Sequence, residues 1–176
     1  MWKILTAILG DTSGDPAKKA ESRQDPVSYV TRLGKTAPAD EAWLAWMSAD
    51  LDRMLGALNT RTNPIDRHFL LMAIVERTYK QRSDPQMAQT CARVAELHLA
   101  EFPQIAPALQ KEFDGNLPHV GTFQRYATLL TEHGEFEKAI NVCRIALSFG
   151  LKDDTLSGFE GRIERIRKKQ PRTLPD

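Results

Sequence analysis

Histidine serves acid–base catalysis and metal binding near neutral pH, so the histidines are the first residues to consider in this sequence. The sequence contains four histidines, His68, His98, His119 and His133, and none of them lies within one helical turn of another. His98 falls on the apolar face of a predicted helix, which favours a core histidine over a ligand. His133 precedes Gly134 at a predicted helix C-terminus, where the helix dipole favours a cation. The histidines therefore predict no metal site.

Other motifs of enzyme chemistry are missing from the sequence. Residues 8–19, ILGDTSGDPAKK, superficially suggest a phosphate loop, but three residues rather than four separate Gly10 from Gly14. Asp15 also takes the place of the phosphate-binding lysine, and its carboxylate would repel phosphate. The sequence has no G-x-S-x-G, H-E-x-x-H or C-x-x-C motif. We therefore predict a protein that is not an enzyme and uses no cofactor.

Composition and charge are those of an ordinary globular chain. Hydrophobic residues make up 41% and charged residues 27% of the 176 positions, and the formal net charge is +1. Because basic and acidic residues are balanced over the helical part, no broad field of one sign attracts a polyanion. Cys91 and Cys143 each lie in an apolar helical pattern, which predicts buried thiols and a cytoplasmic location.

The ends of the chain differ in character from its middle. The start, MWKILTAILG, has an apolar run of about six residues, Ile4–Leu9, too short for a signal peptide or a membrane span. We interpret Met1–Leu9 as an anchor that docks on the chain's own core, with a partner or a membrane surface as the alternatives. Residues 1–39 are thus predicted to be this segment plus a flexible linker, 40–170 a helical domain, and 171–176 a disordered tail.

The elements that must position any site are predicted to be helices, because apolar residues recur at helical spacing from residue 40 and no stretch alternates as a strand would. Asn63 with Pro64, and Asp84 with Pro85, are typical of helix starts. Pro103 is expected to end the helix that begins at Pro85. The other predicted helices cover about 40–58, 107–113, 118–133 and 135–149, and the last begins at Asp154 or Thr155.

The most specific pattern is VGTFQRYATLLTEHGEFEKAINVCRIALSFGLKD, which spans 34 residues, 120–153. Its large and small apolar residues recur at fixed positions on either side of a turn at Gly134: Phe123, Tyr126, Ala127 and Leu130 before it, and Phe136, Ala139, Cys143, Ala146 and Leu147 after it. This pattern resembles the tetratricopeptide (TPR) motif, although Ala127 replaces the commoner Gly. A weaker likeness covers residues 65–102. The resemblance implies an all-α fold, a right-handed array of antiparallel helix hairpins with a C-terminal capping helix.

Function is implied by the same resemblance. TPR-like arrays bind peptides or protein surfaces in a concave groove lined by the first helix of each hairpin. The chain is therefore expected to be a non-enzymatic scaffold with a protein or peptide partner, and a homo-oligomer is compatible with this expectation. The groove-facing positions would be Gln124, Thr128 and Thr131 in the clear unit, with Arg77 and Lys80 in the upstream hairpin.

The basic stretch FEGRIERIRKKQPR, residues 159–172, has two interpretations. One is a capping helix with a single apolar face formed by Leu156, Phe159, Ile163 and Ile166. Asp154 would then cap its start, Ser157 and Glu160 would form a capping box, and the cations would point into solvent. These cations are Arg162, Arg165 and Lys169. The alternative is a nucleic-acid-associated accessory protein that uses this basic helix.

Overall fold

The computed structural model describes residues 27–171, and the expectations for Met1–Leu9 and for residues 172–176 lie outside this range. The described chain is predominantly helical, as predicted. Its elements are β1 (Tyr29–Arg32), β2 (Lys35–Pro38), α1 (Glu41–Ser48), α2 (Leu51–Gly56), the 3-10 helix η1 (Ala57–Asn59), α3 (Pro64–Lys80), α4 (Pro85–Glu112), α5 (Gly121–Glu132), α6 (Phe136–Ser148) and α7 (Gly158–Lys169). None of the helices in this range is both long and apolar enough to cross a bilayer.

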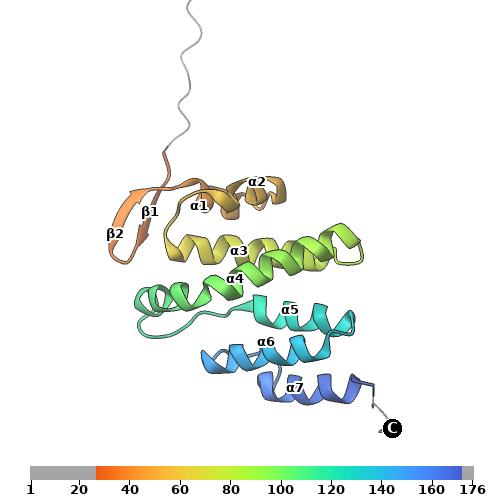
Figure 1. Cartoon of the computed structure of the whole chain (residues 1–176). Helices are drawn as coiled ribbons and strands as arrows, with labels where there is room; N and C mark the ends of the chain where they lie inside the picture. Colours follow the sequence, from red (N-terminus) through yellow and green to blue (C-terminus); the bar gives the residue numbers. More distant parts are fainter. Residues whose placement is uncertain (1–26, 172–176) are drawn as a thin grey trace, which may run out of the picture.

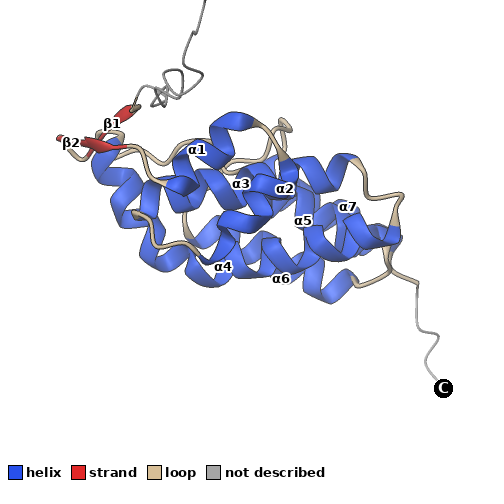
Figure 2. Ribbon diagram, turned by 90° about the horizontal axis from the view of Figure 1, so that it is seen from above, coloured by secondary structure: helices blue, strands red, loops and turns tan. Residues whose placement is uncertain are grey.

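The helices stack in chain order. Helix α3 packs along α4, α5 along α6, and α6 against α7, while α3 and α4 both contact α5. Figure 1 shows this succession of layers, with α1 and α2 on the side of α3 that faces away from α4, and α7 at the far end. Seen from above in Figure 2, the β1–β2 hairpin lies at one edge of the helical stack.

The prediction that no stretch forms a strand is wrong for residues 29–38. Tyr29 pairs with Pro38 and Arg32 with Lys35 in an antiparallel hairpin. The turn residues Leu33 and Gly34 both have positive φ, 52° and 75°, as a two-residue type I′ hairpin turn requires. Leucine is not the Asn or Asp that usually marks this turn, and each strand has only four residues, so the sequence pattern gave no strand signal.

A buried carboxylate attaches the hairpin to the helices. Arg32 donates two hydrogen bonds to Oδ1 of Asp66, from Nη2 at 2.8 Å and from Nε at 3.2 Å. Asp66 is fully buried in the first turn of α3, where Asn63 donates to its second oxygen at 2.6 Å. The indole nitrogen of Trp46 lies 3.4 Å from Oδ1. A charge so removed from water needs several partners, and the guanidinium of β1 is the cationic one.

Two predicted helix boundaries are wrong. The helix expected over 40–58 is broken, because Ala49 takes a left-handed conformation with φ 60° and Asp50 then caps α2 by accepting from the amide of Arg53 at 3.0 Å. Pro103 does not end α4, which continues through Pro107 to Glu112 and includes the helix expected over 107–113. Both prolines lie on the exposed side, while the buried stripe of α4 runs on through Phe102, Ile105, Ala106 and Leu109. Packing of that stripe offsets the backbone hydrogen bonds that the prolines remove.

Other boundaries agree more closely with the sequence. Asn63 and Asp84 cap α3 and α4 as predicted, each by accepting from two backbone amides. The turn at Gly134 has φ 77° and separates α5 from α6. Helix α5 begins at Gly121 rather than near Pro118, and α7 begins at Gly158 rather than at Asp154 or Thr155.

The cap of α4 gives a test of local stability. We expect Asp84→Ala to lower the free energy of unfolding by about 1 kcal/mol, because the amides of Gln86 and Met87 lose their acceptor. The matching fall in melting temperature is about 2–4 °C for a domain of this size. Thermal unfolding measures it, and Asp84→Asn is the control, because asparagine caps equally well. An equal loss in both variants would contradict the capping role.

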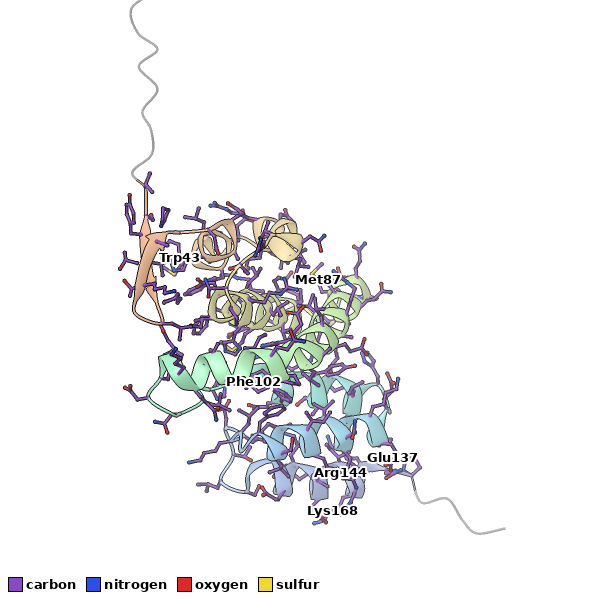
Figure 3. All side chains as sticks on the ribbon, turned by 60° about the vertical axis from the view of Figure 1, so that its left-hand side comes forward. Trp43, Met87, Phe102, Glu137, Arg144 and Lys168 are labelled. Atoms are coloured by element: carbon purple, nitrogen blue, oxygen red, sulfur yellow. The ribbon has the colours of Figure 1, made fainter. Side chains whose placement is uncertain are left out.

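Phe102 lies at the centre of the stack, between α4 and the helices that follow it (Figure 3). Its ring meets those of Phe123 and Phe149 edge-on, with centroids 5.2 Å and 4.9 Å away. The small residues of the 120–153 unit, Ala127, Ala139 and Ala146, are fully buried. Small side chains let α5 and α6 approach closely, and the aromatic rings fill the spaces beside them.

Candidate partner-binding groove

A hollow of about 140 Å³ lies between α5 and α7. Its walls are Thr128, Thr131 and Glu132 from α5, and Arg162, Arg165, Ile166 and Lys169 from α7. We call this the α5–α7 hollow. It forms because α7 packs mainly on α6 and leaves the outer face of α5 partly open beside it.

An ion pair fixes one wall of the α5–α7 hollow. Arg162 binds the buried carboxylate of Asp153 through Nε and donates from Nη1 to the hydroxyl of Thr128 at 2.9 Å. Thr128 in turn donates to the carbonyl of Gln124 one turn earlier. The prediction that Arg162 points into solvent is therefore wrong, because the buried Asp153 needs a cationic partner. With its charge compensated, Arg162 acts as a fixed part of the wall.

The remaining cations of this hollow are less constrained. Arg165 donates to the hydroxyls of Ser157 and Thr155, at 2.7 Å and 3.3 Å. Within the described residues, neither Arg165 nor Lys169 has a carboxylate within 4.0 Å. The carboxylate nearest in the wall, Glu132, is held by Arg82 at 2.8 Å, and this hydrogen bond lowers the pKa of Glu132. The hollow therefore presents two cations that have no close ion pair among the described residues, beside threonine hydroxyls, although the charge of Lys169 also acts on Glu132.

The structure brings together only part of the predicted site. Thr128 and Thr131 line the α5–α7 hollow, while Gln124 lies one turn away on the same helix with its side-chain oxygen buried and without a donor among the described residues. Arg77 and Lys80 belong to α3 and do not line this hollow. Lys80 instead pairs with Glu76 of its own helix at 3.1 Å.

The α7 side chains of this hollow are not identified as site residues by any pattern in the sequence. The apolar stripe of α7 predicts only that its cations leave the core, and nothing in the spacing says that they turn toward α5. The stripe itself is shorter than predicted: Phe159, Ile163 and Ile166 are buried, whereas Leu156 is fully exposed. The capping box is also absent, because the Ser157 side chain makes no cap hydrogen bond and receives one from Arg165.

Comparison with known proteins adds no assignment. No protein-family model, curated protein or solved structure matches this chain. The chemistry of the described residues is therefore the basis for any functional proposal.

A second polar constellation lies inside the stack, where α3, α4 and α5 meet. His68 Nδ1 and His98 Nε2 are 3.0 Å apart, and His98 Nδ1 lies 2.8 Å from the hydroxyl of Thr122. All three residues are fully buried, so the prediction that His98 is a core residue is confirmed. Burial lowers the pKa of His68 to about 4 and holds the pKa of His98 well below its usual value. Both rings are therefore neutral near pH 7.

A substrate cannot reach the hydrogen-bonded group formed by His68, His98 and Thr122. The rings of Phe69 and Phe102 lie against His68, with centroids 5.0 Å and 6.3 Å from it, and its Nε2 has no hydrogen-bond partner among the described residues. A catalytic base must reach a substrate proton within hydrogen-bond distance. Residues 27–171 also contain no cluster of three or more metal-binding side chains. His68, His98 and Thr122 together connect three helices and have no access to solvent.

Proposed function

We propose that this protein is a non-enzymatic interaction scaffold of the TPR-like type, which binds a peptide or protein surface in a groove that includes the α5–α7 hollow. One observation carries the proposal: the hollow is formed by Thr128 and Thr131, at the positions of the 120–153 unit that are expected to face a groove, and by α7, the helix that follows this unit. The stacking of α3 with α4 and of α5 with α6 supports it.

The charges in the hollow favour a partner with a carboxylate. Arg165 and Lys169 attract an acidic side chain or a chain terminus. The hydroxyls of Thr128 and Thr131 already donate to carbonyls of α5, so toward a peptide backbone they act as acceptors. Arg162 contributes less, because its charge is already neutralised by Asp153. The partner is thus expected to be an acidic peptide segment that is held by both charge and hydrogen bonds.

Selection of peptides against the full chain tests this proposal. Peptides from a random display library are selected, synthesised and titrated against the wild-type chain and against Arg165→Glu. We expect the charge reversal to weaken binding by about tenfold or more, because an attraction at the site becomes a repulsion. Arg144→Glu is the matched control, because Arg144 is an exposed cation of α6 that does not line the hollow (Figure 3). An equal loss in both variants, or no selected peptide, would contradict the proposal.

The same titration separates the scaffold from the nucleic-acid alternative. In α7, Arg162 is paired with Asp153, and Arg167 with Glu164 at 2.6 Å, which leaves fewer cations for phosphates. A single-stranded oligonucleotide at about 0.15 M salt is expected not to compete with the selected peptides. Competition that weakens steeply with added salt would favour the nucleic-acid-associated function instead.

A further inference from the structure

A second and larger hollow, of about 450 Å³, lies between α4 and α6. Its floor is apolar and consists of Leu99, Tyr126, Leu130, Val142 and Ile145. We call it the α4–α6 groove. Tyr126 is two residues from Thr128, which is a rotation of about 200° around an α-helix. The α4–α6 groove and the α5–α7 hollow therefore lie on opposite sides of α5, and the proposed peptide site does not account for this groove.

The rim of the α4–α6 groove carries a negative charge. Glu96 and Glu137 stand at its edge, and the one lysine there, Lys138, is paired with Glu135. Glu96 accepts a hydrogen bond from the Tyr126 hydroxyl at 2.5 Å. Burial, together with Glu96, raises the pKa of Tyr126, so this phenol stays a neutral donor. An apolar floor with an acidic rim suits an apolar segment that carries a positive charge.

The chain itself contains such a segment. Residues 2–9 read WKILTAIL and have one charged residue, Lys3. Leu5, Ile8 and Leu9 have the i, i+3, i+4 spacing that places side chains on one helical face. The groove follows α6 from Lys138 to Ile145, about 10 Å, and a helical run of six residues covers about 9 Å. The length of the segment therefore matches the length of the groove, and the positive charge of Lys3 complements the acidic rim.

The hollow beneath the hairpin suits this segment less well. It is lined by Val30, Leu33 and Ala37, but also by Lys35 and Lys111, which would repel Lys3. Arg32 is paired with Asp66, and the one carboxylate of this lining, Asp40, is outnumbered by the two lysines. Distance along the chain does not restrict the choice. Residues 10–26 can extend over about 55 Å, whereas a domain of this size has a radius of gyration of about 15 Å.

We propose that residues 2–9 of this chain occupy the α4–α6 groove, with the leucine and isoleucine side chains on its apolar floor and Lys3 near the carboxylates of its rim. The docking is intramolecular, because the linker holds the segment at an effective concentration of about millimolar or more, which makes even a weak contact well populated. The segment would then cover an apolar surface on the outer side of the stack.

Hydrogen exchange of the full chain, followed by mass spectrometry, tests this docking. In the wild type we expect the amides of residues 4–9 to exchange about tenfold more slowly than in Ile145→Glu, which places a charge on the groove floor. Leu156→Glu is the control, because Leu156 is an exposed apolar residue outside the groove, and it should leave the protection unchanged. Equal exchange in the wild type and Ile145→Glu would overturn the proposal. Protection that disappears on dilution would overturn the intramolecular docking and point to a second copy.

A second variant keeps the test independent of the fold of Ile145→Glu. Ile8→Asp changes only the segment, and methyl NMR of the full chain then compares the groove with the surface beneath the hairpin. We expect the methyl signals of Leu130, Val142 and Ile145 to shift, and that of Val30 to stay unchanged. A shift confined to Val30, or no shift at either surface, would overturn the assignment.

Discussion

Replacing Phe159 with alanine is expected to lower the free energy of unfolding by about 3–5 kcal/mol. The Phe159 side chain is 1% exposed and anchors the first turn of α7, the last layer of the stack. Ile163 and Ile166 continue the same buried face. Loss of the ring leaves a cavity beneath α7 and exposes part of α6, the helix on which α7 packs. A large effect is therefore expected because α7 covers the apolar face of α6 at the end of the helical stack.

Leu156→Ala is the control for this experiment. The sequence pattern places Leu156 on the same face as Phe159, but the structure leaves it fully exposed. We expect its replacement to change the free energy of unfolding by less than about 0.5 kcal/mol. Urea unfolding of both variants measures the difference. Similar losses at the two positions, or an unchanged stability in Phe159→Ala, would contradict the buried position of α7.

Acidification is expected to destabilise the fold through His68 and His98. In the folded chain the pKa of His68 is lowered from 6.5 to about 4, so below pH 6.5 the unfolded chain binds more protons than the folded one. The contribution of neutral His68 to the free energy of unfolding is fully present above about pH 6.5 and is lost as the pH decreases toward 4. Between about pH 7.5 and pH 4.5, His68 alone removes about 2–3 kcal/mol of stability. His98, whose pKa is also lowered by burial, acts in the same direction.

Geometry explains why protonation is so unfavourable at this position. His68 Nδ1 and His98 Nε2 are 3.0 Å apart, so they share one hydrogen bond only while at least one of these two nitrogens keeps its lone pair. After burial, the charge of a protonated His68 lowers the pKa of His98 further, and the charge of Arg67 acts in the same direction. The carboxylate that accompanies Arg67, Glu101, is engaged by it in two hydrogen bonds of 2.8 Å. A proton on the pair therefore gains little compensation from its surroundings.

Urea unfolding at several pH values measures this effect. The double variant His68→Phe/His98→Leu should lose less stability between about pH 7.5 and pH 4.5 than the wild type, by at least the 2–3 kcal/mol of His68. His133→Gln is the control, because His133 is exposed at the end of α5. The comparison also removes the contribution of surface carboxylates, which is common to all variants. An unchanged pH dependence in the double variant would contradict the role of the buried pair.

The sequence predicts those parts of the fold that depend on local chemistry. Asn63 before Pro64 and Asp84 before Pro85 mark two helix starts, because a cap satisfies amides only a few residues away. Where tertiary contacts decide, local rules fail. Pro103 is a helix terminator in isolation, but the buried face around it holds α4 together. The hairpin likewise depends on Asp66, a residue far along the chain that no local pattern connects to Arg32.

The candidate site likewise contains some residues that the sequence predicts and others that it does not. Thr128 and Thr131, which line the α5–α7 hollow, were predicted because the resemblance of residues 120–153 to a repeat motif assigns groove-facing positions to the first helix of the unit. Arg165 and Lys169 could not, because their direction depends on the angle at which α7 packs on α6. The contact between His68 and His98 could not be predicted from the sequence either, because two histidines on different helices meet only when α3 and α4 pack together.

The buried position of Asp66 has a consequence for local opening. Asp66 is both the partner of Arg32 in the hairpin and a neighbour of the cap residue Asn63 at the start of α3. Detachment of the hairpin would leave a carboxylate without its cation in a place that water does not reach. Fraying at residues 29–38 is therefore coupled to fraying of the first turn of α3, and the two segments are expected to open as one cooperative unit.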